Sequence, residues 1–326
     1  MAAAPLATDR RLARYAWAVL AWLVVVVLWG AFVRATGSGA GCGRHWPRCD
    51  GEVIPRLASV EQVIEYTHRA TSGLAGILVL GLLAWAWRAL PRRHPARAGA
   101  AAATVLLVME ALIGAGLVKL ELVAGNQSAA RVWWMAAHLV NTFLLLGAVA
   151  LTAWWASGGA RVRLRGQGAL AWVLGAAVVA TILVGVTGAV TALGDTLFPK
   201  TEVGLAVAPA AHFLERLRVV HPVVAILTGV YVVAAGAFAR KLRPDAATAR
   251  LSHLLAALFA AQLAAGAVNV VLLAPVWMQL VHLLLADAVW IALVCTTASA
   301  LAERPVAVAA REVEAADTRP AAVVAG

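Results

Sequence analysis

Long apolar runs alternate with short polar stretches along the whole chain. Each run has about 20 residues, which is enough to cross a hydrocarbon core of roughly 30 Å. Segments in lipid must be helices or strands of closed barrels, and these runs are too long and continuous for barrel strands. We therefore predict an all-α polytopic membrane protein with eight transmembrane helices, near residues 13–33, 61–88, 98–118, 132–156, 168–193, 213–239, 250–273 and 277–301.

The composition agrees, because 63% of the residues are hydrophobic and only 13% are charged, which excludes an ordinary soluble domain. The net charge of +11 does not indicate nucleic acid, since most basic residues fall in segments on one side of the membrane, at 10–14, 88–97, 161–165, 240–250 and 304–319. The positive-inside rule then predicts a multi-pass protein of the plasma membrane with both termini in the cytoplasm. We expect contact with membrane lipid and no nucleic-acid partner.

The eight helices divide into two sets of four with the same plan. In each set a long outer loop that opens with Thr-Gly follows the first helix, and the second and fourth helices carry a histidine. This layout predicts two four-helix bundles related as parallel repeats. We expect an N-terminal bundle at 1–157 with its outer loop at 34–60, a C-terminal bundle at 158–303, and a disordered cytoplasmic tail at 304–326.

Four histidines, His68, His138, His221 and His282, each lie about seven residues from the outer end of a helix, roughly 10 Å into the membrane. Ionisable residues inside a membrane span are costly and are commonly functional. Two imidazoles that face each other across a helix bundle can bind one haem iron axially. Two histidines per site fall short of the three protein ligands of catalytic zinc. We therefore predict two haem sites, one in each bundle.

Glu65 lies three residues before His68 and shares its helix face. A carboxylate beside a porphyrin can accept protons or stabilise positive charge, and the guanidinium of Arg69 is suited to a haem propionate. A simple Glu65–Arg69 ion pair is the alternative. The second half has Arg218 at the matching position, so we expect one haem to carry electrons and the other to be chemically changed.

Cys42 and Cys49 lie in the first outer loop, on the oxidising side of the membrane, where disulfides persist. We predict that they form a disulfide bond that closes a small loop over the N-terminal bundle. Such a bond can be a structural link or a redox-active pair that passes electrons toward the haem.

These motifs resemble those of the haem A synthase family. "EYTHR" (65–69) is similar to the E-x-x-H-R motif of its second helix, and "TGSGAGC…WPRC" (36–49) is similar to its first outer loop. "TGAVTALGD" (187–195) is a looser match in the second half. The resemblance covers roughly residues 13–302. Two features depart from the family: no second cysteine pair lies between the fifth and sixth helices, and Pro222 follows the third histidine where arginine is often found.

The resemblance implies an oxidoreductase that converts a methyl group of haem O to a formyl group, giving haem A for cytochrome oxidase. His68 and His138 would hold the substrate haem O, with Glu65 as the catalytic acid and Arg69 near a propionate. His221 and His282 would bind a haem b cofactor that relays electrons. A haem O synthase and an unidentified electron donor are the implied partners.

Two other functions fit parts of the pattern. A di-haem b-type electron-transfer cytochrome linked to quinone explains the four histidines, but it does not explain why only one half has an acid. A transporter with parallel repeats explains the layout, but it leaves the histidines without a role.

Overall fold

The computed structural model describes residues 8–56, 58–199 and 213–303, and within them it contains eight α-helices, one short 3₁₀ helix at Ser38–Ala40 and no β-strand. All eight α-helices are long and apolar enough to cross a membrane, which confirms the predicted fold class. They are α1 Arg10–Ala35, α2 Val60–Ala89, α3 Pro95–Lys119, α4 Ala129–Ala156, α5 Ala169–Leu197, α6 Phe213–Leu242, α7 Ala246–Val271 and α8 Val276–Ala300.

Several helices begin earlier than the apolar runs indicate, because their first turns are polar and start at a capping side chain. The Asp9 carboxylate accepts hydrogen bonds from two backbone N–H groups at the start of α1. Asp245 accepts one from the Thr248 N–H at the start of α7, and Ser59 forms a capping box with Gln62 on α2. These caps satisfy N–H groups that have no partner within the helix. Hydropathy alone does not detect them.

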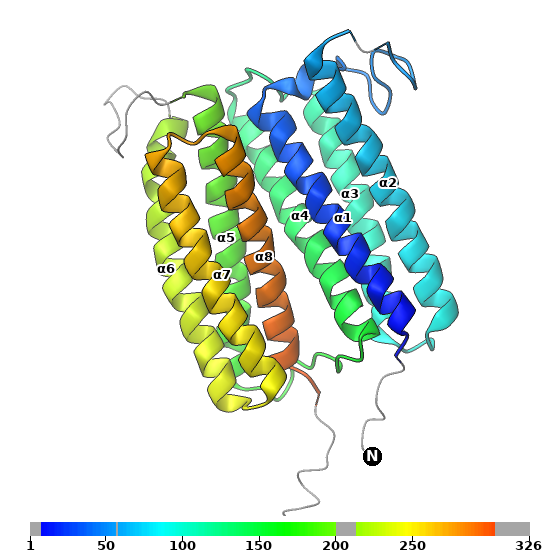
Figure 1. Cartoon of the computed structure of the whole chain (residues 1–326), viewed down its shortest axis with the longest axis vertical. Coiled ribbons are helices and arrows are strands. Elements are labelled where there is room, and N and C mark those ends of the chain that lie inside the picture. The colour runs from blue at the N-terminus through cyan, green and yellow to red at the C-terminus, as the bar shows by residue number, and fades with distance from the viewer. Residues whose placement is uncertain (1–7, 57, 200–212, 304–326) are drawn as a thin grey trace, which may run out of the picture.

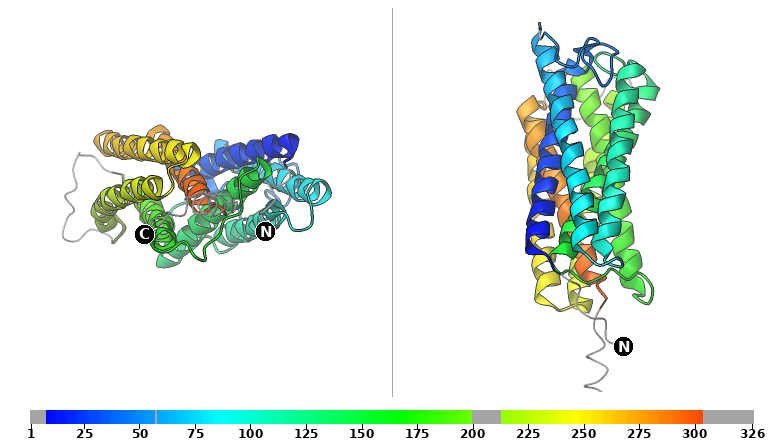
Figure 2. Two further views of the ribbon diagram at one scale, coloured as in Figure 1. Left: turned by 90° about the horizontal axis from the view of Figure 1, so that it is seen from below. Right: turned by 90° about the vertical axis from the view of Figure 1, so that its right-hand side faces the viewer.

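Helices α1 to α4 pack around one buried cluster and α5 to α8 around another (Figure 1). Helices α4 and α8 lie where the two groups meet, as the view from below shows (Figure 2). There the rings of Phe143 and Trp290 stack with centroids 5.0 Å apart, and the Trp290 indole N–H donates to the Phe143 carbonyl at 2.6 Å. The predicted parallel repeat and the predicted boundary at residue 157 stay predictions.

The start of α1 and the end of α8, which adjoin the two described ends of the chain, lie at the same end of the helices (Figure 1). The loop at residues 36–56 lies at the opposite end, which we call the loop end. The predicted disordered tail at 304–326 falls outside the described residues. Helix α6 continues through Pro222, so this proline does not end the helix that carries His221.

Candidate functional site

The four predicted histidines all lie near the loop end. Helices α2, α4, α6 and α8 each begin at that end, and each carries its histidine within about its first three turns. None of these side chains is fully exposed. The structure therefore places all four imidazoles at a similar depth, two among α1 to α4 and two among α5 to α8.

His221 and His282 face each other across the C-terminal group of helices. Their ring centroids are 6.4 Å apart and their planes are nearly perpendicular, at 88°. An imidazole nitrogen binds a metal ion at about 2 Å, so two rings on opposite sides of one ion have centroids about 6 Å apart. The observed separation fits a single iron held between these two rings.

His68 and His138 lie close enough to interact electrostatically, and Glu110 of α3 interacts with both. Oε1 of Glu110 is 3.1 Å from Nδ1 of His138. Sequence reasoning missed Glu110, although an acid inside an apolar run, "LLVMEALIG", is the kind of residue that marks a functional site in a membrane span.

Glycines of the preceding helices pack directly against three of the four imidazoles. A β-carbon added to Gly30 of α1 would lie 3.0 Å from Cε1 of His68, and one added to Gly188 of α5 would lie 3.0 Å from Cε1 of His221. A β-carbon added to Gly266 of α7 would lie 3.1 Å from Cε1 of His282. A larger residue at any of these positions would press on the ring, which would have to move by a few tenths of an ångström. Nδ1 of His68 and of His282 is buried without a hydrogen-bond partner among the described residues, which leaves ring nitrogens available to a ligand.

Glu65 lies beside the first outer loop, and only 4% of its side chain is exposed. Its Oε2 accepts a hydrogen bond from the backbone N–H of Cys42 at 2.8 Å, and its Oε1 pairs with the guanidinium of Arg69. Cys42 and Cys49 form a disulfide bond, as predicted. One end of the disulfide-closed loop thus fixes the position of the Glu65 carboxylate.

The loop is held to α2 at several further points. The guanidinium of Arg69 donates to the carbonyl oxygens of His45 and Arg48 as well as to Glu65. Gly41 lies so close to α2 that a β-carbon there would be 2.6 Å from the Glu61 carbonyl group. The ion pair between Glu65 and Arg69, which was the alternative interpretation of these residues, is present, and Arg69 also ties the loop to the helix.

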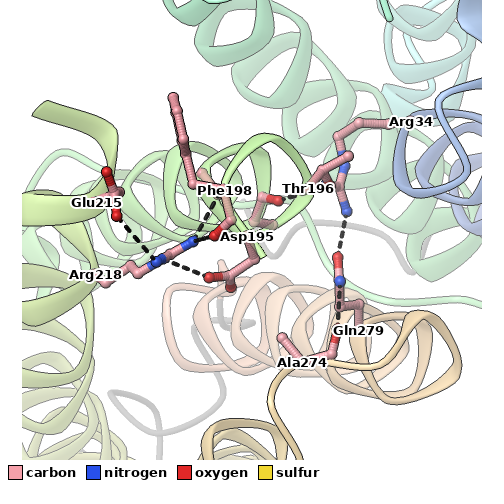
Figure 3. Close-up of polar contacts among 10 residues, drawn as sticks. Arg34, Asp195, Thr196, Phe198, Glu215, Arg218, Ala274 and Gln279 are labelled. Carbon is pink, nitrogen blue, oxygen red and sulfur yellow. Dashed lines mark hydrogen bonds and ion pairs between the residues drawn. The ribbon is translucent and has the colours of Figure 1, made fainter. Parts of the chain in front are cut away.

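In the second half, Arg218 contacts the end of α5 (Figure 3). Its Nε is 2.7 Å from Asp195 Oδ1, and it donates to the carbonyl oxygens of Gly194, at 2.9 Å, and Phe198. The hydroxyl oxygen of Thr187 lies 3.0 Å from Nδ1 of His221. The position that matches Glu65 thus holds a cation, which joins α6 to α5 and pairs with the carboxylates of Asp195 and Glu215.

Arg34 connects the two groups of helices at the loop end, on the other side of the same end of α5 (Figure 3). From α1 it donates to the Ala192 carbonyl at 2.7 Å and to the Thr196 hydroxyl at 2.6 Å, both on α5. It also donates to Oε1 of Gln279 on α8 at 2.8 Å. Three hydrogen bonds from one charged group therefore tie α1 to α5 and α8 at the loop end.

Comparison with known proteins agrees with the motifs. A family model described as "Cytochrome oxidase assembly protein" (COX15-CtaA) matches residues 13–294. A Thermus thermophilus protein named "Protoheme IX farnesyltransferase" is 56% identical over 295 residues, which are 89% of this chain and 48% of that protein. The chain thus spans about half the length of this relative.

Proteins named "Heme A synthase" match a shorter stretch. That of Alkalihalophilus pseudofirmus is 47% identical over 96 residues, 29% of this chain and 32% of that protein. That of Geobacillus kaustophilus is 44% identical over 110 residues, 34% of this chain and 35% of that protein. Since the family model covers most of the sequence and all four histidines, this chain belongs to the COX15-CtaA family of cytochrome oxidase assembly proteins, the haem A synthase family.

Proposed function

We propose that this protein oxidises a methyl group of haem O to a formyl group and so produces haem A for cytochrome oxidase. The observation that carries the proposal is the pair of imidazoles, His221 and His282, at the separation of two ligands of one iron, together with the buried carboxylate of Glu65 three residues before His68, where the C-terminal half has Arg218. Conversion of a methyl group and one water to a formyl group is a four-electron oxidation (CH3 + H2O → CHO + 4 H+ + 4 e−), so it releases protons and needs an acceptor for the electrons. The site therefore needs both a proton acceptor and a route for electrons.

His68 and His138 would hold the substrate haem O, and Glu65 would accept protons released at its methyl group. The contacts of Glu65 suit this role, because the Cys42 N–H and the Arg69 guanidinium hold the carboxylate in one place. The small exposure of this side chain limits the access of water from the loop end. The guanidinium of Arg69 already binds two loop carbonyl oxygens, so it would have to bind a haem propionate in addition to them.

His221 and His282 would hold the haem b cofactor, which when bound supplies one-electron redox chemistry. The protein fixes the positions of the two imidazole rings. Thr187 contacts Nδ1 of His221, and Gly188 and Gly266 leave room for the rings of His221 and His282. Arg34 joins α1, in the N-terminal half that would bind haem O (the substrate half), to α5 and α8 in this half.

A Gly188→Ala variant is expected to bind haem in the C-terminal half about tenfold more weakly or worse. The new methyl group would press on the His221 ring, and overpacking of this kind costs about 1–3 kcal/mol. Haem retained per protein after gel filtration measures the effect. Gly175→Ala on the same helix is the matched control, because nothing lies within 4 Å of the added carbon. Equal haem retention in both variants would contradict this role of Gly188.

The Thermus relative supports the proposed substrate, because its printed name describes a farnesyltransferase that acts on protohaem IX. Haem O is a farnesylated protohaem, so an enzyme of that class would supply the substrate. We propose that such a haem O synthase is a partner of this chain, along with a redox partner that exchanges electrons with the haem b.

We further propose that the protein lies in the plasma membrane with both termini in the cytoplasm. Both described ends lie at one end of the helices (Figure 1). The basic clusters at 10–14, 88–97 and 240–250 lie at this same end, as the positive-inside rule requires.

Extraction of the bound haems tests the proposed function. The full-length protein is produced together with a haem O synthase in a host that makes no haem A, and the haems are separated by chromatography. We expect haem A in these cells and none in cells that lack the protein. Two reversibly reducible b haems without any haem A would instead support the di-haem cytochrome, and a colourless protein would exclude both.

A further inference from the structure

The carboxylate of Glu110 is held in place on α3 by side chains of α4. Nδ2 of Asn141 donates to its Oε2 at 2.5 Å and to the Leu106 carbonyl at 2.8 Å, which anchors the pair to α3. The Thr142 hydroxyl contacts Oε1 of Glu110. Only 19% of the Glu110 side chain is exposed, in the middle of an apolar helix. A carboxylate in such a place is costly, so its position calls for a function.

Oε1 of Glu110 is 3.1 Å from Nδ1 of His138, at ion-pair distance. The two atoms lie within hydrogen-bond reach, although the contact is not a regular hydrogen bond. This contact occupies the Nδ1 side of the ring. The other nitrogen, Nε2, is then the one left for a ligand.

No other histidine of the four has an acidic partner of this kind among the described residues. Nδ1 of His221 contacts the neutral Thr187 hydroxyl, Nε2 of His282 lies 3.3 Å from the Gln262 amide nitrogen, and Nδ1 of His68 has no partner. Glu110 on α3 and Gln262 on α7 each approach the histidine of the following helix. The substrate half thus has an anion beside Nδ1 of His138, and the other half has an amide beside Nε2 of His282.

We infer that Glu110 is a positioning residue that orients His138 and increases the electron donation of its imidazole to the substrate iron. A ligating histidine whose second ring N–H is bound to a carboxylate is a stronger donor, and its tautomer and ring orientation are fixed. Stronger donation stabilises the ferric state and lowers the reduction potential. The inference rests on the proposed function, because it assigns His138 as a ligand of haem O.

The test uses Glu110→Gln, which keeps the size of the side chain and an oxygen that can accept from Asn141, but removes the charge. It is made in full-length protein that also carries His282→Ala, so that one haem remains. The detergent-solubilised protein is reconstituted with haem O, and its midpoint potential is measured by spectroelectrochemistry. We expect a more positive potential than in the parent protein. Glu121→Gln is the control, since this carboxyl is 63% exposed and should leave the potential unchanged.

An unchanged potential in haem-loaded Glu110→Gln would overturn the inference while leaving the proposed function intact. Failure of the parent protein to bind haem O would overturn both. If Glu110→Gln does not retain haem, Glu110→Asp decides the matter. Haem binding by Glu110→Asp supports the role of the charge, and loss of haem from both variants shows a packing role and overturns the inference.

Discussion

Glu65→Gln is expected to bind both haems and to form haem A at least about 100-fold more slowly than the wild type, because a positioned general acid or base contributes typically 10²–10⁴-fold. The glutamine can still accept a hydrogen bond from the Cys42 N–H and fills the same space. It can neither accept a proton nor pair ionically with Arg69. Conversion of haem O to haem A, measured by chromatography of extracted haems, reports the effect.

Glu61→Gln is the matched control for this prediction. Glu61 lies one turn earlier on the same helix and is exposed. Its substitution should leave both haem content and turnover unchanged. If Glu65→Gln forms haem A within a few-fold of the wild-type rate, Glu65 is not the proton acceptor.

His282→Ala is expected to remove the haem of the C-terminal half completely and to leave that of the N-terminal half bound. Loss of one of two axial ligands leaves a single imidazole, and His221 lies in a separate group of helices from the other pair. The haem content per protein, measured as the pyridine haemochrome, should therefore fall by about half. Formation of haem A should stop as well, because the electron route is lost.

His253→Ala is the control for the histidine variant. His253 is exposed on α7 and contacts Arg240, away from the four ligands. This variant should keep the full haem content. Equal haem content in His282→Ala and the wild type would show that His282 is not a haem ligand.

Much of the fold could be predicted because hydropathy and chain length constrain a membrane helix strongly. The eight spans were predicted within a few residues of α1 to α8. The remaining errors are at helix ends: α1 and α7 begin at polar caps on Asp9 and Asp245, and α5 continues to Leu197 beyond its apolar run. A cap is a side-chain hydrogen bond, which a hydropathy average does not detect.

The disulfide bond could be predicted as well, since both cysteines lie in one short loop on the oxidising side. That the Cys42 N–H would bind Glu65 could not be predicted. This contact depends on how the loop folds back on α2, where Gly41 allows close approach. Sequence spacing places Glu65 beside His68, but it contains no information about a backbone group 23 residues away.

The sequence by itself determined the number of helices, the depth of the four histidines and the difference between Glu65 and Arg218 at matching positions, because these follow from local composition and helix geometry. The tertiary structure decided which groups meet: His221 with His282, Glu110 with His138, and Arg34 with α5 and α8. Such contacts depend on the rotation of each helix about its axis and on its neighbours. In lipid these are set by the packing of small residues and by polar contacts between helices, and hydropathy along one helix does not specify them.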